Sequence, residues 1–235
     1  MIARVPFYLL LGIVAVLTSF AQLDRSSRFA PQLAAWVPPA LSGFAAEQRT
    51  RIAIEAQQGD VALTEARNLI ARRPLPGEHL ALLSTAAVLE EDRVLALSAL
   101  EASAARGWRV PVAQYASARA ALSSGQHDIA AQRISALLAT SALADETHAL
   151  LAELIASPEG RGAMARRYAA GGHWQANSLT SALPAADPQH VALLLAEALD
   201  AGASLPCERL ALVAGSYTPE QADLAALFWP RDCTD

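Results

Sequence analysis

The N-terminal end of the chain constrains the fold more than any other feature. No charged residue lies between Arg4 and Asp24, and Val5–Leu23 reads VPFYLLLGIVAVLTSFAQL. As a helix with a rise of about 1.5 Å per residue, this run is roughly 28 Å long, close to the thickness of the bilayer hydrocarbon core. A soluble domain would have to be larger to bury a helix that is apolar on every face. The run therefore predicts a single membrane-spanning helix.

A cleaved signal peptide is the alternative for this segment. Arg4 would then be the basic region and Ser19–Ala21 the small-residue cleavage site. The apolar run is longer than the usual signal core of about 7–15 residues, which favours a retained anchor. Arg25 and Arg28 on the far side balance Arg4 and the α-amino group, so arginine counting does not set the topology. We expect the rest of the chain to lie outside the cytoplasm.

Residues 24–42 are predicted to be a juxtamembrane linker. Three prolines interrupt this segment, and each lacks the N–H that a continuous helix needs. Phe29 and Trp36 have two possible positions. Their rings could lie at the lipid–water interface, where amphipathic aromatic side chains are favoured, or pack on the domain that follows.

From about residue 43 the sequence is typical of an all-α fold. Apolar residues recur at spacings of three and four, and the alternating pattern of half-buried strands is absent. Glycine and proline divide the chain into segments of about 12 to 16 residues. Segments of this length predict short helical hairpins.

These segments repeat with a period of about 34 residues. Copies that begin at Gly77, Pro111 and Asp145 place similar residues at matching positions. The matching sets are Leu83, Ser117 and Leu151; Ser84, Ala118 and Ala152; Ala96, Ala130 and Met164; and Leu100, Ile134 and Tyr168. This pattern resembles the tetratricopeptide (TPR) repeat, whose paired helices carry small residues where they cross. In the 34 residues before Gly77, only the second helix fits the TPR pattern, with Ala62, Ala66 and Leu69 at the matching positions.

The resemblance implies an α-solenoid of TPR-like hairpins, and a nonrepetitive helical bundle is the alternative. Beyond the repeats, Pro188–Ala201 is expected to be a buried helix. Thr218–Gln221 carries the capping box and first-turn proline of a last helix. The predicted organisation is a transmembrane anchor or signal peptide over residues 1–23, a juxtamembrane linker over 24–42, TPR-like repeats over 43–178 and C-terminal capping helices over 179–235.

Composition excludes several classes of function. An apolar content of 53% excludes disorder, and the net charge of −5 argues against nonspecific nucleic-acid binding, which requires a basic face. No motif for a catalytic serine or cysteine is present. We therefore expect a protein that is not an enzyme.

Two local patterns fall short of a cofactor or metal site. Gly160–Ala165 matches a dinucleotide fingerprint, but a helix rather than a strand precedes it. Ser157 and Pro158 instead predict an ordinary helix start, with Ser157 as the N-cap and Pro158 in the first turn. Asp145, Glu146, His148 and Glu153 follow one another along a helix, whereas a metal site needs three or four converging ligands. No cofactor and no metal are expected.

The resemblance also implies a groove lined by the first helix of each repeat. The residues expected there are Glu78, Thr85, Tyr115 and Arg119. Tyr115 and Arg119 lie one helical turn apart, as an aromatic and cationic pair for a peptide or an acidic group would. The alternative is a core tyrosine beside a solvated arginine.

A second candidate surface follows in the next helix. Arg166 and Arg167 could bind an anionic lipid or a sugar acid, with Trp174 as a stacking platform. Alternatively, the arginines only interact favourably with the negative end of their own helix dipole.

Cys207 and Cys233 are the two cysteines of the chain, and both lie near the C-terminus. Two antiparallel helices between them would bring the cysteines together, which makes a disulfide geometrically reasonable. Such a bond persists in an oxidising compartment. Two buried free thiols in a cytoplasmic domain are the alternative.

Bacterial proteins with the layout that the resemblance implies often serve envelope machinery. We therefore expect a non-enzymatic interaction scaffold, tethered to the inner membrane through Val5–Leu23, with a periplasmic domain that binds protein partners. One alternative is an accessory subunit of a membrane complex, since Gly12, Ala15 and Ser19 give the helix a stripe of small residues. The other is an enzyme that modifies an envelope polymer.

Overall fold

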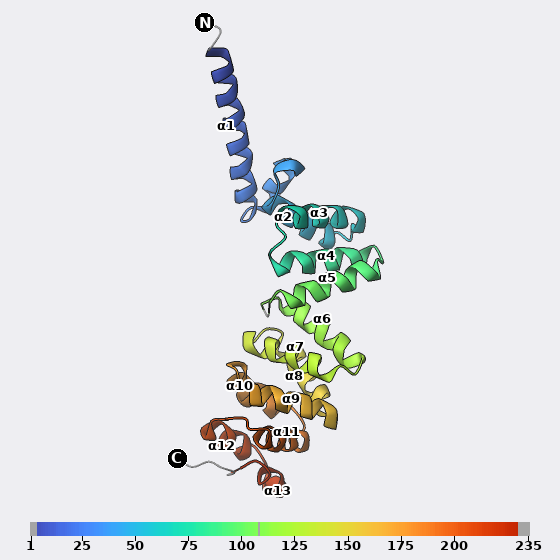
Figure 1. Cartoon of the computed structure of the whole chain (residues 1–235), viewed down its shortest axis with the longest axis vertical. Helices are drawn as coiled ribbons and strands as arrows, with labels where there is room; N and C mark the ends of the chain where they lie inside the picture. The colour runs from blue at the N-terminus through green and yellow to red at the C-terminus, as the bar shows by residue number, and fades with distance from the viewer. Residues whose placement is uncertain (1–3, 108, 230–235) are drawn as a thin grey trace. The chain divides into compact units, whose positions relative to one another are not determined.

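The structure, a computed structural model, describes residues 4–107 and 109–229 and is all-α, with no strand in these ranges (Figure 1). The chain forms two compact units, Met1–Arg106 and Gly107–Asp235. Each unit is built from helical hairpins, as the spacing of apolar residues and of the glycine and proline breaks predicts.

The first unit begins with α1 (Arg4–Ser27), an isolated apolar helix. Within α1, Pro6–Ser27 is long and apolar enough to cross a membrane, and an 18-residue stretch of it has a mean hydropathy of 1.8 and no buried residue. Figure 1 shows α1 extending away from the hairpins of its unit, in dark blue. The predicted apolar helix is therefore confirmed, and it exposes its side chains on every face.

Four helices form the hairpins of the first unit. They are α2 (Phe44–Glu55), α3 (Gly59–Arg72), α4 (Gly77–Leu89) and α5 (Arg93–Ala105). Ala53, Ala62, Ala66 and Ala86 are fully or almost fully buried where these helices cross, together with Leu83. Small side chains allow the helix axes to approach closely, which explains why alanine stands at these positions.

The segment between α1 and α2 packs against its own unit. It contains two short 3₁₀ turns, η1 (Pro31–Trp36) and η2 (Pro39–Leu41), and each begins at a proline. Ala34 and Val37 pack with Leu23 of α1 and Ala45 of α2. The residues predicted to be a linker thus form a folded connection.

The second unit contains eight α-helices and one π-helical turn among its described residues. They are α6 (Pro111–Ser123), α7 (His127–Thr140), α8 (Ala144–Ile155), α9 (Pro158–Ala170), α10 (Trp174–Asn177), the π turn η3 (Ser178–Ala182), α11 (Pro188–Asp200), α12 (Cys207–Gly215) and α13 (Ala222–Ala225). One hydrophobic core extends from Ala118 to Phe228. The helices after residue 178 therefore share a core with α7, α8 and α9.

A turn geometry recurs in both units. The second helices α3, α5 and α7 begin at Gly59, Arg93 and His127, so each starts 34 residues after the previous one. The turn before each of them holds one left-handed residue, which is Gln57 (φ 56°), Glu91 (φ 57°) or Gly125 (φ 69°). In every case the next N–H bonds back to the carbonyl five residues earlier, as in a Schellman motif.

Helix ends in the second unit confirm several local predictions. Ser157 caps α9 by accepting the N–H of Gly160, and Thr218 and Gln221 form the predicted capping box. The fingerprint-like Gly160–Ala165 lies inside α9, where α8 precedes it. Helix α11 is buried along one face, close to the predicted limits.

Candidate functional site

The predicted groove residues lie in both units. On α4, Glu78 and Thr85 are exposed, and the Thr85 hydroxyl donates to the Ala81 carbonyl of its own helix. On α6, Tyr115 is half-buried against the core of the second unit. Arg119 is exposed, and its Nη1 lies 2.5 Å from a carboxylate oxygen of Glu153 on α8. Glu153 therefore already neutralises Arg119, which an acidic partner would have to displace.

The second predicted surface differs from the expectation at Trp174. This side chain is only 5% exposed, and its ring lies 4.7 Å from that of buried Tyr168. Trp174 is therefore a core residue, which corrects its prediction as a stacking platform. Arg166 pairs with Asp128 at 2.6 Å on the surface, and Arg167 is half-buried. The sequence shows only that Trp174 lies a few residues after Arg166 and Arg167, and that proximity does not reveal the packing of its ring on Tyr168.

The acidic residues of the sequence do not form a metal site, and only one of the two cysteines of the predicted disulfide is described. Within residues 4–107 and 109–229, no three His, Cys, Asp or Glu side chains converge as ligands. Cys207 begins α12. Cys233 lies outside the described residues, so its pairing with Cys207 stays a prediction.

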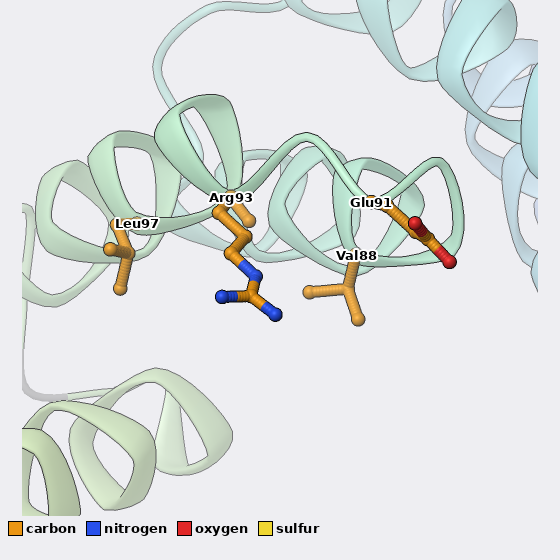
Figure 2. Close-up of a pocket in the computed structure, with 5 residues that line it drawn as sticks. Val88, Glu91, Arg93 and Leu97 are labelled. Carbon is orange, nitrogen blue, oxygen red and sulfur yellow. The ribbon is translucent and has the colours of Figure 1, made fainter.

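The end of the α4–α5 hairpin carries a surface that sequence reasoning missed. Val88, Glu91, Arg93, Ala96 and Leu97 line a hollow of about 680 Å³, and we call this set the hairpin surface. Figure 2 shows Val88, Arg93 and Leu97 directed to the same side of the hairpin. Val88 and Leu97 are both exposed although they are apolar. Helical periodicity alone could not separate these two residues from the core leucines beside them.

The junction between α1 and α2 is held by a single carboxylate. Asp24, in the last turn of α1, accepts hydrogen bonds from the backbone N–H groups of Gly43 and Ala45 at 2.8 Å and of Phe44 at 3.2 Å. These are free N–H groups at the start of α2, where the helix dipole also favours a negative charge. Asp24 therefore acts as the cap of a helix that begins 20 residues later in the chain.

Arg49 holds the connecting segment on the same junction. Its guanidinium donates to the carbonyl oxygens of Ala34 at 2.8 Å and Val37 at 3.2 Å, and to the Ser42 hydroxyl at 2.9 Å. Glu65 of α3 balances the charge at 3.0 Å. As a result, α1, η1 and α2 are connected by polar contacts as well as by the small apolar cluster.

Glu47 on α2 lies at the centre of a partly buried charge cluster. Its carboxylate is 3.0 Å from Arg51, 3.2 Å from Arg73 and 3.4 Å from His79 Nε2. His79 is buried, and its Nδ1 donates to the Arg73 carbonyl at 2.8 Å. The hydrogen bond with His79 is the main cause that lowers the pKa of Glu47 to about 2, against the opposing effect of burial and with a further contribution from Arg51.

No family model, no curated protein and no solved structure matches this chain. The function therefore has to be inferred from the apolar helix α1, the hairpins and the exposed surfaces described above.

Proposed function

We propose that this chain is a membrane-anchored, non-enzymatic interaction scaffold of the bacterial cell envelope, with its hairpins in the periplasm. The observation that carries the proposal is the exposed apolar helix α1, which continues directly into a folded helical unit. A helix that leaves nearly all of its apolar surface uncovered by the protein needs a lipid environment. The hairpins then provide a surface held close to the membrane.

A retained anchor is favoured over a cleaved signal peptide by the local structure. Ser19–Ala21 lies inside α1, and the Ser19 hydroxyl donates to the Ala15 carbonyl at 2.8 Å. Proteolytic sites concentrate in exposed, flexible segments rather than within a regular helix. The Asp24 cap follows directly and joins α1 to α2 within the first unit.

The recurring turns support a TPR-like arrangement of the hairpins. Starts of α3, α5 and α7 every 34 residues, with a left-handed residue before each, are typical of a repeat rather than of an irregular bundle. Ala62, Ala96 and Ala130 occupy one position of this period, and all three are buried. TPR-like solenoids bind other proteins through exposed helix faces, which is the basis for proposing a scaffold.

The hairpin surface is the part of the first unit that best suits a protein partner. Val88 and Leu97 present apolar side chains next to the guanidinium of Arg93. A partner segment that carries apolar side chains beside a carboxylate would complement this arrangement.

The proposal is tested with the full chain, purified in mild detergent from its own host with covalently stabilised partners. Proteins that co-purify with the wild type are identified and compared with those of the double variant Val88→Asp/Leu97→Asp. We expect this variant to lose a defined envelope protein at unchanged helicity. Leu212→Asp is the matched control, since Leu212 is equally exposed but lies on α12 of the second unit. Equal capture by the double variant would place the interface elsewhere.

A further inference from the structure

Two aromatic side chains near the end of α1 are exposed to an unusual degree. Phe29 is 84% exposed and Trp36 is 74% exposed. Their neighbours Ala34 and Val37 are buried, so the segment is folded and the rings are directed away from its packed side. Packing within the unit therefore does not account for these two rings.

The position of Trp36 relative to α1 suggests what covers it. The stretch Pro6–Leu23 is about 27 Å long at about 1.5 Å per residue, so a bilayer core of about 30 Å ends close to Leu23. Leu23, near the end of α1, packs with Ala34 and Val37. These two residues stand before and after Trp36 in the chain. Figure 1 shows η1 turning back beside the last turns of α1, in light blue. Trp36 thus lies at the depth of the lipid headgroups once α1 spans the membrane.

The charges around these rings favour an anionic surface. Arg25 and Arg28 are exposed, and neither is in an ion pair with any described residue. The Arg28 guanidinium lies 5.6 Å from the centre of the Phe29 ring. Between Phe20 and Gly43 the one acid is Asp24, whose carboxylate is occupied by the start of α2.

We propose that Arg25, Arg28, Phe29 and Trp36 form a headgroup-binding surface for anionic phospholipid, here named the juxtamembrane shelf. The inference rests on the proposed function, because it requires α1 to span the membrane. The amphipathic indole of Trp36 is favoured at the headgroup level, and arginine side chains held next to the membrane surface are attracted to anionic headgroups. The Asp24 cap fixes the shelf to the anchor, so the first unit has one orientation on the bilayer instead of swinging on a tether.

The test uses the full chain reconstituted in phosphatidylcholine vesicles with and without phosphatidylglycerol. Insertion of α1 is measured first, by resistance of the protein to alkaline extraction. The depth of Trp36 is then measured with lipids brominated either near the headgroup or near the bilayer centre. The fluorescence of Trp36→Phe is subtracted from that of the wild type, so the quenching of this one tryptophan is isolated.

We expect Trp36 to be quenched strongly by the shallow bromines and weakly by the deep ones. Phosphatidylglycerol should increase the quenching, and Arg25→Gln/Arg28→Gln should abolish that increase. Asp24→Ala should remove most of the quenching while α1 stays inserted and the chain stays helical by circular dichroism, because the shelf is then no longer fixed to the anchor.

Two results would overturn the shelf, and they are distinguishable. If α1 is inserted but Trp36 is not quenched, the shelf is wrong and the anchor stands, and a protein surface is then the partner of these rings. If the protein is removed by alkaline extraction, the anchor itself is wrong, and the shelf fails with it.

Discussion

Gln57 and Glu91 hold the same left-handed backbone conformation, with φ angles of 56° and 57°, at matching places in two hairpins of the first unit. Each is followed by an N–H that bonds back across the turn, from Gln58 to Ala53 and from Asp92 to Ala87. The third turn of the series has Gly125 at this place. All three turns therefore place a residue in the left-handed conformation at this position. Only one of the three has glycine there.

Gln57→Gly and Glu91→Gly are each expected to stabilise the protein by up to about 1 kcal/mol, because a residue with a Cβ is strained in the left-handed region. The free energy of unfolding, measured by urea titration followed by circular dichroism, checks this. Gly125→Ala is the converse test and should destabilise by a similar amount. An added Cβ at Gly125 meets no atom within 4 Å, so any loss comes from the backbone angle alone.

If all three substitutions leave the unfolding free energy unchanged, these turns do not hold the left-handed conformation. An increase in the free energy of unfolding for Gly125→Ala would also show that Gly125 is not left-handed. Alanine is favoured over glycine where the backbone angle is ordinary.

Acid is expected to weaken the first unit through Glu47. Folding lowers the pKa of this carboxyl from its ordinary value of 4.5 to about 2, so the stabilisation is complete above about pH 4.5 and is lost as the pH falls towards 2. Allowing for solvent screening, we expect about 2 kcal/mol between these limits. The pH dependence of thermal unfolding measures this contribution.

Glu47→Gln should lower the melting temperature at neutral pH and flatten its dependence between pH 4.5 and 2. Glu153→Gln is the control, because Glu153 and its partner Arg119 are each about half exposed and such pairs contribute little. An unchanged acid profile in Glu47→Gln would show that Arg51, Arg73 and His79 do not stabilise the ionised carboxylate.

Overpacking tests the repeat position that Ala130 occupies. Ala130 is 0% exposed in the core of the second unit. Ala130→Leu should therefore destabilise by about 1–3 kcal/mol, because the added atoms have no space at the helix crossing. Ala139→Leu lies on the exposed side of the same helix and should leave the melting temperature nearly unchanged. Equal melting temperatures for the two variants would contradict the register.

The predicted bond between Cys207 and Cys233 can be tested chemically. Closing a loop of about 25 residues stabilises by roughly 3–4 kcal/mol in the chain-entropy model. Alkylation of protein from cells with trapped thiols should label neither cysteine before reduction and both afterwards. Labelling of both before reduction would contradict the bond and the periplasmic location that it supports.

The proposed interaction scaffold depends on exposed surfaces, and local sequence patterns do not identify all of these surfaces equally well. Val88 and Leu97 have the spacing of ordinary helical core residues, and only the packing of α4 on α5 leaves them outside. Trp174 is the opposite case, because it is predicted to be a stacking platform at the surface whereas its ring packs on Tyr168. Burial depends on neighbours that are distant in the chain, which a local pattern does not contain.

The sequence by itself determined the long apolar N-terminal helix, the helical hairpins and the 34-residue spacing of their second helices, and the caps at Ser157 and Thr218. These features depend on interactions within a few residues, namely helical periodicity, the conformational limits of glycine and proline, and side chains that bond to nearby backbone. They can therefore be found in a single chain.

Tertiary structure alone decided how the anchor joins the first unit. Asp24 bonds the start of α2, and Glu47 pairs with His79, across separations of about 20 and 30 residues in the chain. Many other acids in the sequence have equal capacity to cap a helix or to pair with a histidine. Only the folded chain brings one of them within hydrogen-bond distance, and that selection fixes how α1 joins α2 in the first unit.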